Sequence, residues 1–138
     1  MYKKVLLAAD GSEHSLRAAE QAKTLISGNK GFIDIIFVVS GAASKEDVLH
    51  HASKEEINAS RKESLKEIEM NFQNSDTDYQ IHILHGEPGP TIVDFANKND
   101  YDCVVLGSRG LNQVQSLVLG SVSHKVAKRV ESPVMIVK

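Results

Sequence analysis

Short apolar runs recur along the chain, and longer segments with helical spacing separate them. The run at residues 32–39 is interrupted only by Asp34 and is rich in β-branched residues, as is typical of a strand covered on both faces of a parallel sheet. Residues 79–84 alternate instead, with Gln80 and His82 opposite Tyr79 and Ile81, which predicts a strand at the edge of the sheet. The predicted strands are residues 4–9, 32–39, 79–84, 103–106 and 134–137.

Between these runs, apolar residues return every three or four positions, and this spacing predicts amphipathic helices. Pro90 is placed to open one of them, because proline is favoured in the first turn of a helix. Residues 41–51 form a polar connection. The predicted helices lie around residues 16–26, 57–72, 90–99 and 121–130.

Strands and helices alternate strictly in this prediction, which indicates an open parallel sheet with helices on both faces. In such sheets a ligand binds at the carboxyl ends of the strands, where the strand order reverses. The search for a functional site therefore narrows to residues 9–12, residues 38–41 and the segment that begins at Gly107.

Composition excludes several classes of protein. A chain of 138 residues with 41% hydrophobic and 25% charged residues is typical of one ordered, soluble domain, which we expect to span residues 1–138. The net charge of -2 and the absence of tryptophan argue against a nucleic-acid partner. No apolar run is long enough for a signal peptide or a membrane span, so we expect no membrane partner and a cytoplasmic protein. The single cysteine, Cys103, is predicted to be a buried, inert thiol.

Glycines and serines near the end of the chain indicate a phosphate site. Gly107 and Gly110 follow the fourth strand, and Gly120, Ser121 and Ser123 open the last helix. Glycines allow close approach of a ligand, and a helix N-terminus offers unpaired N–H groups and partial positive charge. Each residue taken singly is better explained by loop shape or helix capping. Their combination at the end of a strand favours phosphate binding without a Walker loop, since no Gly-Lys-Ser sequence is present.

Four other residues are candidates for the same site. Arg109 can reach a phosphate, although a loop arginine is often only solvated. Asp10 can hold a ribose hydroxyl or a divalent ion, and with Glu13 it also fits a capping box. The backbone groups of Val38 and Val39 can read an adenine edge, whereas their side chains fit plain core packing.

The six histidines give no metal signature, and no hydrolytic triad can be assembled from neighbouring residues. We therefore expect histidines at surface or turn positions. We assign no catalytic residue.

Asp10-Gly11-Ser12 after the first strand, together with Gly107-x-x-Gly110 and Gly120-Ser121 after nine further residues, resembles the universal stress protein family. The resemblance spans the chain and includes Gly86-Glu87-Pro88 and the closing segment from Ser132 to Val137. It implies an open five-stranded parallel sheet of the Rossmann-like, adenine nucleotide alpha hydrolase-like type, with strand order 3-2-1-4-5.

Within that family the glycine pattern marks the members that bind ATP, and every element of the pattern is present here. The resemblance therefore implies ATP with Mg²⁺, an indirect contact from Asp10 to the metal, and a homodimer formed through residues 134–137. This last strand is an apolar edge without cover in one chain, which agrees with pairing to a second copy. The implied nucleotide-binding residues are Ala9, Asp10, Val39, Gly107, Arg109, Gly110, Gly120, Ser121, Val122 and Ser123.

The leading interpretation is an ATP-binding stress or signalling protein whose nucleotide state alters dimer or partner contacts. The lack of a P-loop lysine and of an evident base argues against efficient phosphoryl transfer. Two alternatives stay open: a slow metal-dependent ATP hydrolase or phosphotransferase that uses Asp10, and a dimeric interaction module without nucleotide. The sequence does not choose between ATP, ADP, AMP and a cyclic nucleotide.

Overall fold

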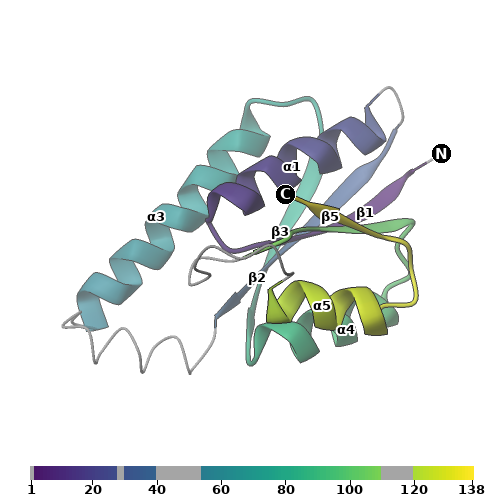
Figure 1. The fold of residues 1–138 in the computed structure, drawn as a ribbon. Coiled ribbons are helices and arrows are strands. Elements are labelled where there is room, and N and C mark those ends of the chain that lie inside the picture. Colours follow the sequence, from purple (N-terminus) through teal and green to yellow (C-terminus); the bar gives the residue numbers. More distant parts are fainter. Residues whose placement is uncertain (1, 28–29, 40–53, 110–119) are drawn as a thin grey trace.

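The computed structural model describes residues 2–27, 30–39, 54–109 and 120–138 (Figure 1). Helices and strands alternate along these residues, as the apolar pattern predicts. The elements are β1 (Lys4–Ala9), α1 (Glu13–Ile26), β2 (Phe32–Val39), α3 (Lys54–Gln73), β3 (Asp78–His85), α4 (Pro88–Lys98), β4 (Cys103–Gly107), α5 (Ser121–Arg129) and β5 (Val134–Val137).

The five strands form one parallel sheet in the order β3-β2-β1-β4-β5, which confirms the predicted fold class and strand order. β3 lies at one edge, as its alternating pattern predicts, and β5 lies at the other. In Figure 1, α1 and α3 cover one face of the sheet, and α4 and α5 cover the opposite face. Strand order reverses between β1 and β4, so a ligand site is expected at the carboxyl ends of these two strands.

Two apolar cores hold the layers together. Alternate residues of β1 supply both cores, because the strand is covered on its two faces: Val5 and Leu7 pack with α1 and α3, whereas Leu6 packs with α4 and α5. All three side chains are fully buried. No helix among the described residues is long and apolar enough to cross a membrane.

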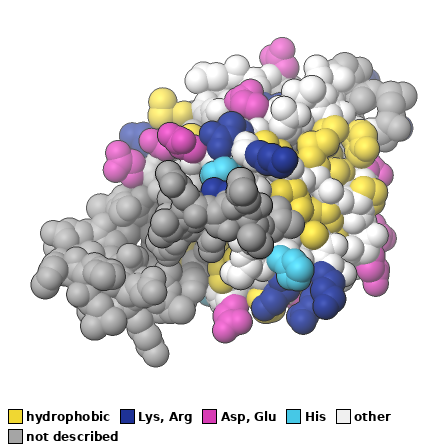
Figure 2. Space-filling view, in the orientation of Figure 1, with side chains coloured by type: hydrophobic (Ala, Val, Ile, Leu, Met, Phe, Trp, Pro, Cys, Tyr) yellow, Lys and Arg dark blue, Asp and Glu magenta, His cyan; other side chains and the backbone are white. Residues whose placement is uncertain are grey.

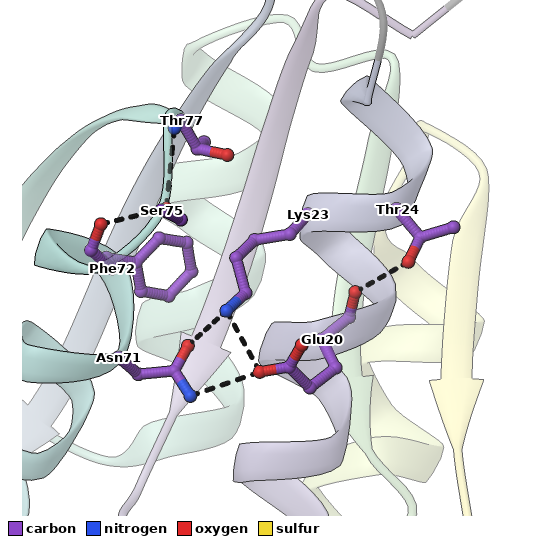
Figure 3. A network of polar contacts seen from close by, with 7 residues as sticks. All are labelled: Glu20, Lys23, Thr24, Asn71, Phe72, Ser75 and Thr77. Carbon is purple, nitrogen blue, oxygen red and sulfur yellow. Dashed lines mark hydrogen bonds and ion pairs between the residues drawn. The ribbon is translucent and has the colours of Figure 1, made fainter.

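A polar network joins α1 to α3 close to the carboxyl ends of both helices (Figure 3). The Lys23 ammonium donates to Asn71 Oδ1 at 2.6 Å and lies 2.9 Å from Glu20 Oε1. Asn71 Nδ2 donates to the same Glu20 oxygen at 3.1 Å. The hydrogen bonds from Lys23 and Asn71 lower the pKa of the Glu20 carboxyl. This network fixes the relative position of the two helices at the end of the molecule away from the candidate site.

A second polar cluster surrounds Asp34, the one charged residue inside the apolar run of β2. Its carboxylate accepts the Tyr101 hydroxyl at 2.6 Å and lies 2.9 Å from His82 Nε2. Asp34 is only 8% exposed, so these contacts compensate for the loss of water around its charge. Burial and the neighbouring Asp34 carboxylate raise the pKa of Tyr101. The cluster ties β2 to β3 and to the segment that leads into β4.

We expect Tyr101→Phe to lower the free energy of unfolding by about 1–3 kcal/mol, because it leaves a buried carboxylate oxygen without its donor. Denaturant unfolding measures this loss. Tyr79→Phe is the matched control, since the Tyr79 hydroxyl makes no hydrogen bond to the described residues and its ring still packs on Phe72. The control should stay within about 0.5 kcal/mol of the parent protein. Equal losses in the two variants would contradict the stabilising role of the Asp34 contact.

Candidate functional site

The turn after β1 places Asp10 at the carboxyl edge of the sheet. The predicted capping box of Asp10 and Glu13 is wrong, because α1 begins at Glu13 and its N-cap is Ser12. The Ser12 hydroxyl accepts the N–H of Ser15 at 3.1 Å, and Asp10 Oδ1 accepts the N–H of Ser12 at 2.9 Å. Asp10 therefore supports the turn that precedes the helix. Its half-buried carboxylate stays at the predicted ligand edge.

Hydrogen bonds join the two glycine-bearing segments that the sequence separates. The N–H of Gly120 donates to the Ser108 carbonyl at 2.9 Å, and the Ser123 hydroxyl donates to the Gly107 carbonyl at 2.6 Å. The N–H of Ser108 in turn donates to the Val137 carbonyl of β5 at 2.7 Å. The end of β4 thus anchors the start of α5. Gly110 and residues 111–119, which complete the predicted segment, lie outside the described residues.

The two described glycines of the pattern have different reasons to lack a side chain. A Cβ on Gly107 would lie 2.6 Å from the Cβ of His14 in α1 and 2.9 Å from the His14 carbonyl carbon. Packing of α1 alone therefore requires glycine at this position. Gly120 has φ -63° and ψ 160°, an extended conformation open to any residue. Backbone strain does not explain glycine at 120, whereas close approach of a ligand would.

The helix N-termini that begin after β1, β3 and β4 differ in the donors they offer an anion. In α1 the N–H of Ser15 is used by Ser12, and Glu13 puts a negative charge in the first turn. In α4 the first turn holds Pro88 and Pro90, which have no N–H at all.

In α5, by contrast, the first turn carries no acidic residue, and helix geometry leaves the N–H groups of its first three residues without an acceptor inside the helix. These donors belong to Ser121, Val122 and Ser123. The start of α5 is therefore the best anion site of the three.

The side chains of this first turn differ in what they can offer. Ser121 is exposed, so its hydroxyl is open to a ligand. Ser123 is 2% exposed and commits its only hydroxyl hydrogen to Gly107. Ser123 therefore offers a phosphate only its backbone N–H as a donor. Val122 is half-buried and packs against the core below α4 and α5, and Arg109 is half-buried just beyond Ser108.

The ends of β1 and β2 provide the other candidate residues. Pairing between these strands ends at Ala9 and Phe37, so Val38 and Val39 extend beyond β1. The Val39 carbonyl accepts the N–H of Gly86 at 3.0 Å and points toward β3. Backbone groups alternate in direction along a strand, so those of Val38 point over the end of β1. The side chain of Ala9 is buried in the core below α1.

Sequence reasoning missed two residues that the fold brings to this edge. His14 was expected at a surface or turn position, but its Nδ1 lies 3.3 Å from the hydroxyl of Ser108, a buried residue. In the glycine pattern of the sequence, Ser108 is only the residue between Gly107 and Arg109. The signal available in the sequence was topological: α1 starts at the sheet edge where the adjacent β4 ends.

Comparison with known proteins agrees with this architecture. The family model described as "Universal stress protein family" matches residues 1–138. The universal stress protein YxiE of Bacillus subtilis is 31% identical, and the match covers 100% of both chains.

Two solved structures show the same fold. The structure of protein MJ0577 of Methanocaldococcus jannaschii has a TM-score of 0.82 at 24% identity, covering 100% of this chain and 96% of that one. A universal stress protein in complex with cAMP has a TM-score of 0.70 at 25% identity, covering 99% of this chain and 97% of that one. The full-length family match and the 31% identical relative show that the chain belongs to the universal stress protein family.

Proposed function

We propose that this protein binds an adenine nucleotide, in the first instance ATP, with the phosphates at the start of α5. The observation that carries the proposal is the arrangement of this N-terminus: N–H donors without an acceptor inside the helix, no acidic residue in the first turn, and a glycine cap held against Ser108. The partial positive charge of a helix N-terminus adds to these donors. Arg109, which follows Ser108 after the end of β4, would supply a positive charge near the phosphates.

The ends of β1 and β2 suit the nucleoside half of the ligand. The backbone of Val38 can pair with an adenine edge above β1, beside the end of Ala9. Asp10 Oδ2 accepts no hydrogen bond from the described residues, so this oxygen is available to a ribose hydroxyl. Val39 contributes less than the sequence suggested, because its carbonyl is already bonded to Gly86.

The structural neighbour crystallised with cAMP supports an adenine nucleotide as the ligand class. The choice of ATP within that class rests on the spacing of Gly107, Gly110, Gly120 and Ser121, which resembles that of the ATP-binding members.

Magnesium would accompany ATP. No group of three histidine, cysteine or acidic side chains among the described residues is placed to hold an ion, and Asp10 offers one free carboxylate oxygen at this edge. These residues fit an ion held mainly by the phosphates themselves, which is how Mg²⁺ often binds with nucleotides. Asp10 would contact it indirectly.

The same geometry favours holding a nucleotide over cleaving it. The Ser123 hydroxyl is committed to Gly107, and His14 Nδ1 faces Ser108 and Arg17. Neither group is free to activate a water molecule beside the phosphates. We propose a cytoplasmic stress or signalling role in which nucleotide binding alters contacts with a second copy or another partner.

Gly120→Val should abolish ATP binding, because a branched side chain at the cap would block the approach of phosphate to the first turn. Titration calorimetry with Mg-ATP measures the effect. Gly89→Ala is the control: Gly89 is also buried, in the first turn of α4, and its added Cβ would meet only the Lys125 side chain, whose flexible end can shift away. The control should bind as the parent does. Tight ATP binding by Gly120→Val would overturn the placement of the phosphates.

Turnover separates binding from the hydrolase alternative. We expect Mg-ATP incubated with the protein to yield phosphate at the spontaneous rate, with Asp10→Ala giving the same rate while binding ATP more weakly. Phosphate release followed by a coupled assay provides the measurement. Rapid, metal-dependent turnover that disappears in Asp10→Ala would instead establish an enzyme.

A homodimer through β5 is the second part of the proposal. β5 is an edge strand whose four apolar residues, Val134–Val137, are each only half-buried. Figure 2 shows hydrophobic side chains gathered on the side of the molecule where β5 lies. The carbonyls of Pro133 and Val137 accept N–H groups from Val104 of β4 and from Ser108 just after it, so the backbone groups of Val134 and Ile136 point away from the sheet. A second β5 can pair with these groups.

Ile136→Pro should convert the dimer to a monomer, because proline removes an outward N–H without taking a bond from the ladder to β4. Multi-angle light scattering at micromolar concentration gives the mass, and circular dichroism confirms that the variant is folded. Ile136→Val keeps the N–H and should remain dimeric. A parent protein that is monomeric under these conditions would contradict the β5 interface.

A further inference from the structure

His14 makes contacts that reach from α1 to the proposed phosphate site. Its Nδ1 lies 3.2 Å from Arg17 Nη2 and 3.3 Å from the hydroxyl of Ser108. Arg17 is held in turn by a hydrogen bond from its Nε to the carbonyl of Lys138 at 2.7 Å. His14 therefore sits between a fixed guanidinium and the end of β4.

These partners determine the state of the imidazole ring. A guanidinium can only donate hydrogen bonds, so Nδ1 of His14 must be the acceptor and the ring proton must lie on Nε2. The Ser108 hydroxyl then also donates to Nδ1. Two donors share one lone pair, which agrees with the length of both contacts.

Ser108 connects His14 to Gly120, the N-cap of α5. Its carbonyl accepts the N–H of Gly120, and its N–H is fixed on Val137 of β5. The backbone of His14 also lies directly over Gly107, whose carbonyl holds the Ser123 hydroxyl. Both contacts that position the first turn of α5 thus end on residues that His14 touches.

We propose that His14, oriented by Arg17, is a positioning residue for the phosphate site. It orients Ser108 and thereby the cap of α5, and it leaves the nucleoside half of the site untouched. This inference rests on the proposed nucleotide function for its effect on affinity, but its effect on the cap does not need a ligand.

The test compares His14→Ala with His14→Asn. Asparagine places Oδ1 where Nδ1 stands, so it restores the acceptor for Ser108 and Arg17, and alanine does not. Calorimetry with Mg-ATP and with adenosine separates the two halves of the site. We expect His14→Ala to weaken ATP about fivefold or more and adenosine less than about twofold, and His14→Asn to bind both as the parent does.

Amide hydrogen exchange at Gly120, measured by NMR without nucleotide, tests the same link independently. His14→Ala should speed exchange of this amide about fivefold or more, and His14→Asn should leave it unchanged. Equal weakening of ATP and adenosine, or unchanged exchange in His14→Ala, would overturn the positioning role. If the parent binds neither ligand, the proposed function fails, and the exchange measurement alone decides whether His14 positions the cap.

Discussion

Ser123 gives its hydroxyl hydrogen to the Gly107 carbonyl, and the Ser108 carbonyl receives the N–H of Gly120. Because both acceptors belong to the last residues of β4 and its turn, the start of α5 is held on a strand whose residues 103–106 are all buried. These two hydrogen bonds set where the first turn of α5 lies relative to the end of β4. The N–H groups of the first turn of α5, which have no acceptor inside the helix, therefore lie near the carboxyl end of β4, where the strand order reverses.

The fold could be predicted because burial leaves a direct trace in the sequence. A strand covered on both faces must be apolar throughout, and the ranges 4–9, 32–39 and 134–137 agree with the structure at both ends. The predicted starts of the helices were less accurate, because a helix start depends on which side chain caps the first turn. At α1 the N-cap is Ser12 and not Asp10. Asp10 lies in the turn before the cap, where it accepts the N–H of Ser12.

The candidate site was predictable only in part, for a related reason. Glycines at a strand end and serines at a helix start are local signals, and the sequence shows both. The contact of His14 with Ser108 joins residues 94 positions apart, and that of Asp34 with Tyr101 joins residues 67 apart. Such polar pairs leave no periodic pattern, so a single sequence does not reveal them. The same limit applies to Gly107, whose lack of a side chain serves the packing of α1 as well as any ligand.

This double constraint bears on what the glycine pattern means. A chain that lost its ligand would still need Gly107, because α1 crosses it at 2.6 Å from where a Cβ would stand. The extended backbone of Gly120 is open to any residue, and we propose that close approach of the phosphates accounts for glycine there. On that proposal the second half of the pattern marks nucleotide binding, whereas the fold alone already requires the glycine at 107. The helix already holds the first-turn N–H donors of α5 in place, which reduces the ordering that binding of the proposed nucleotide would require.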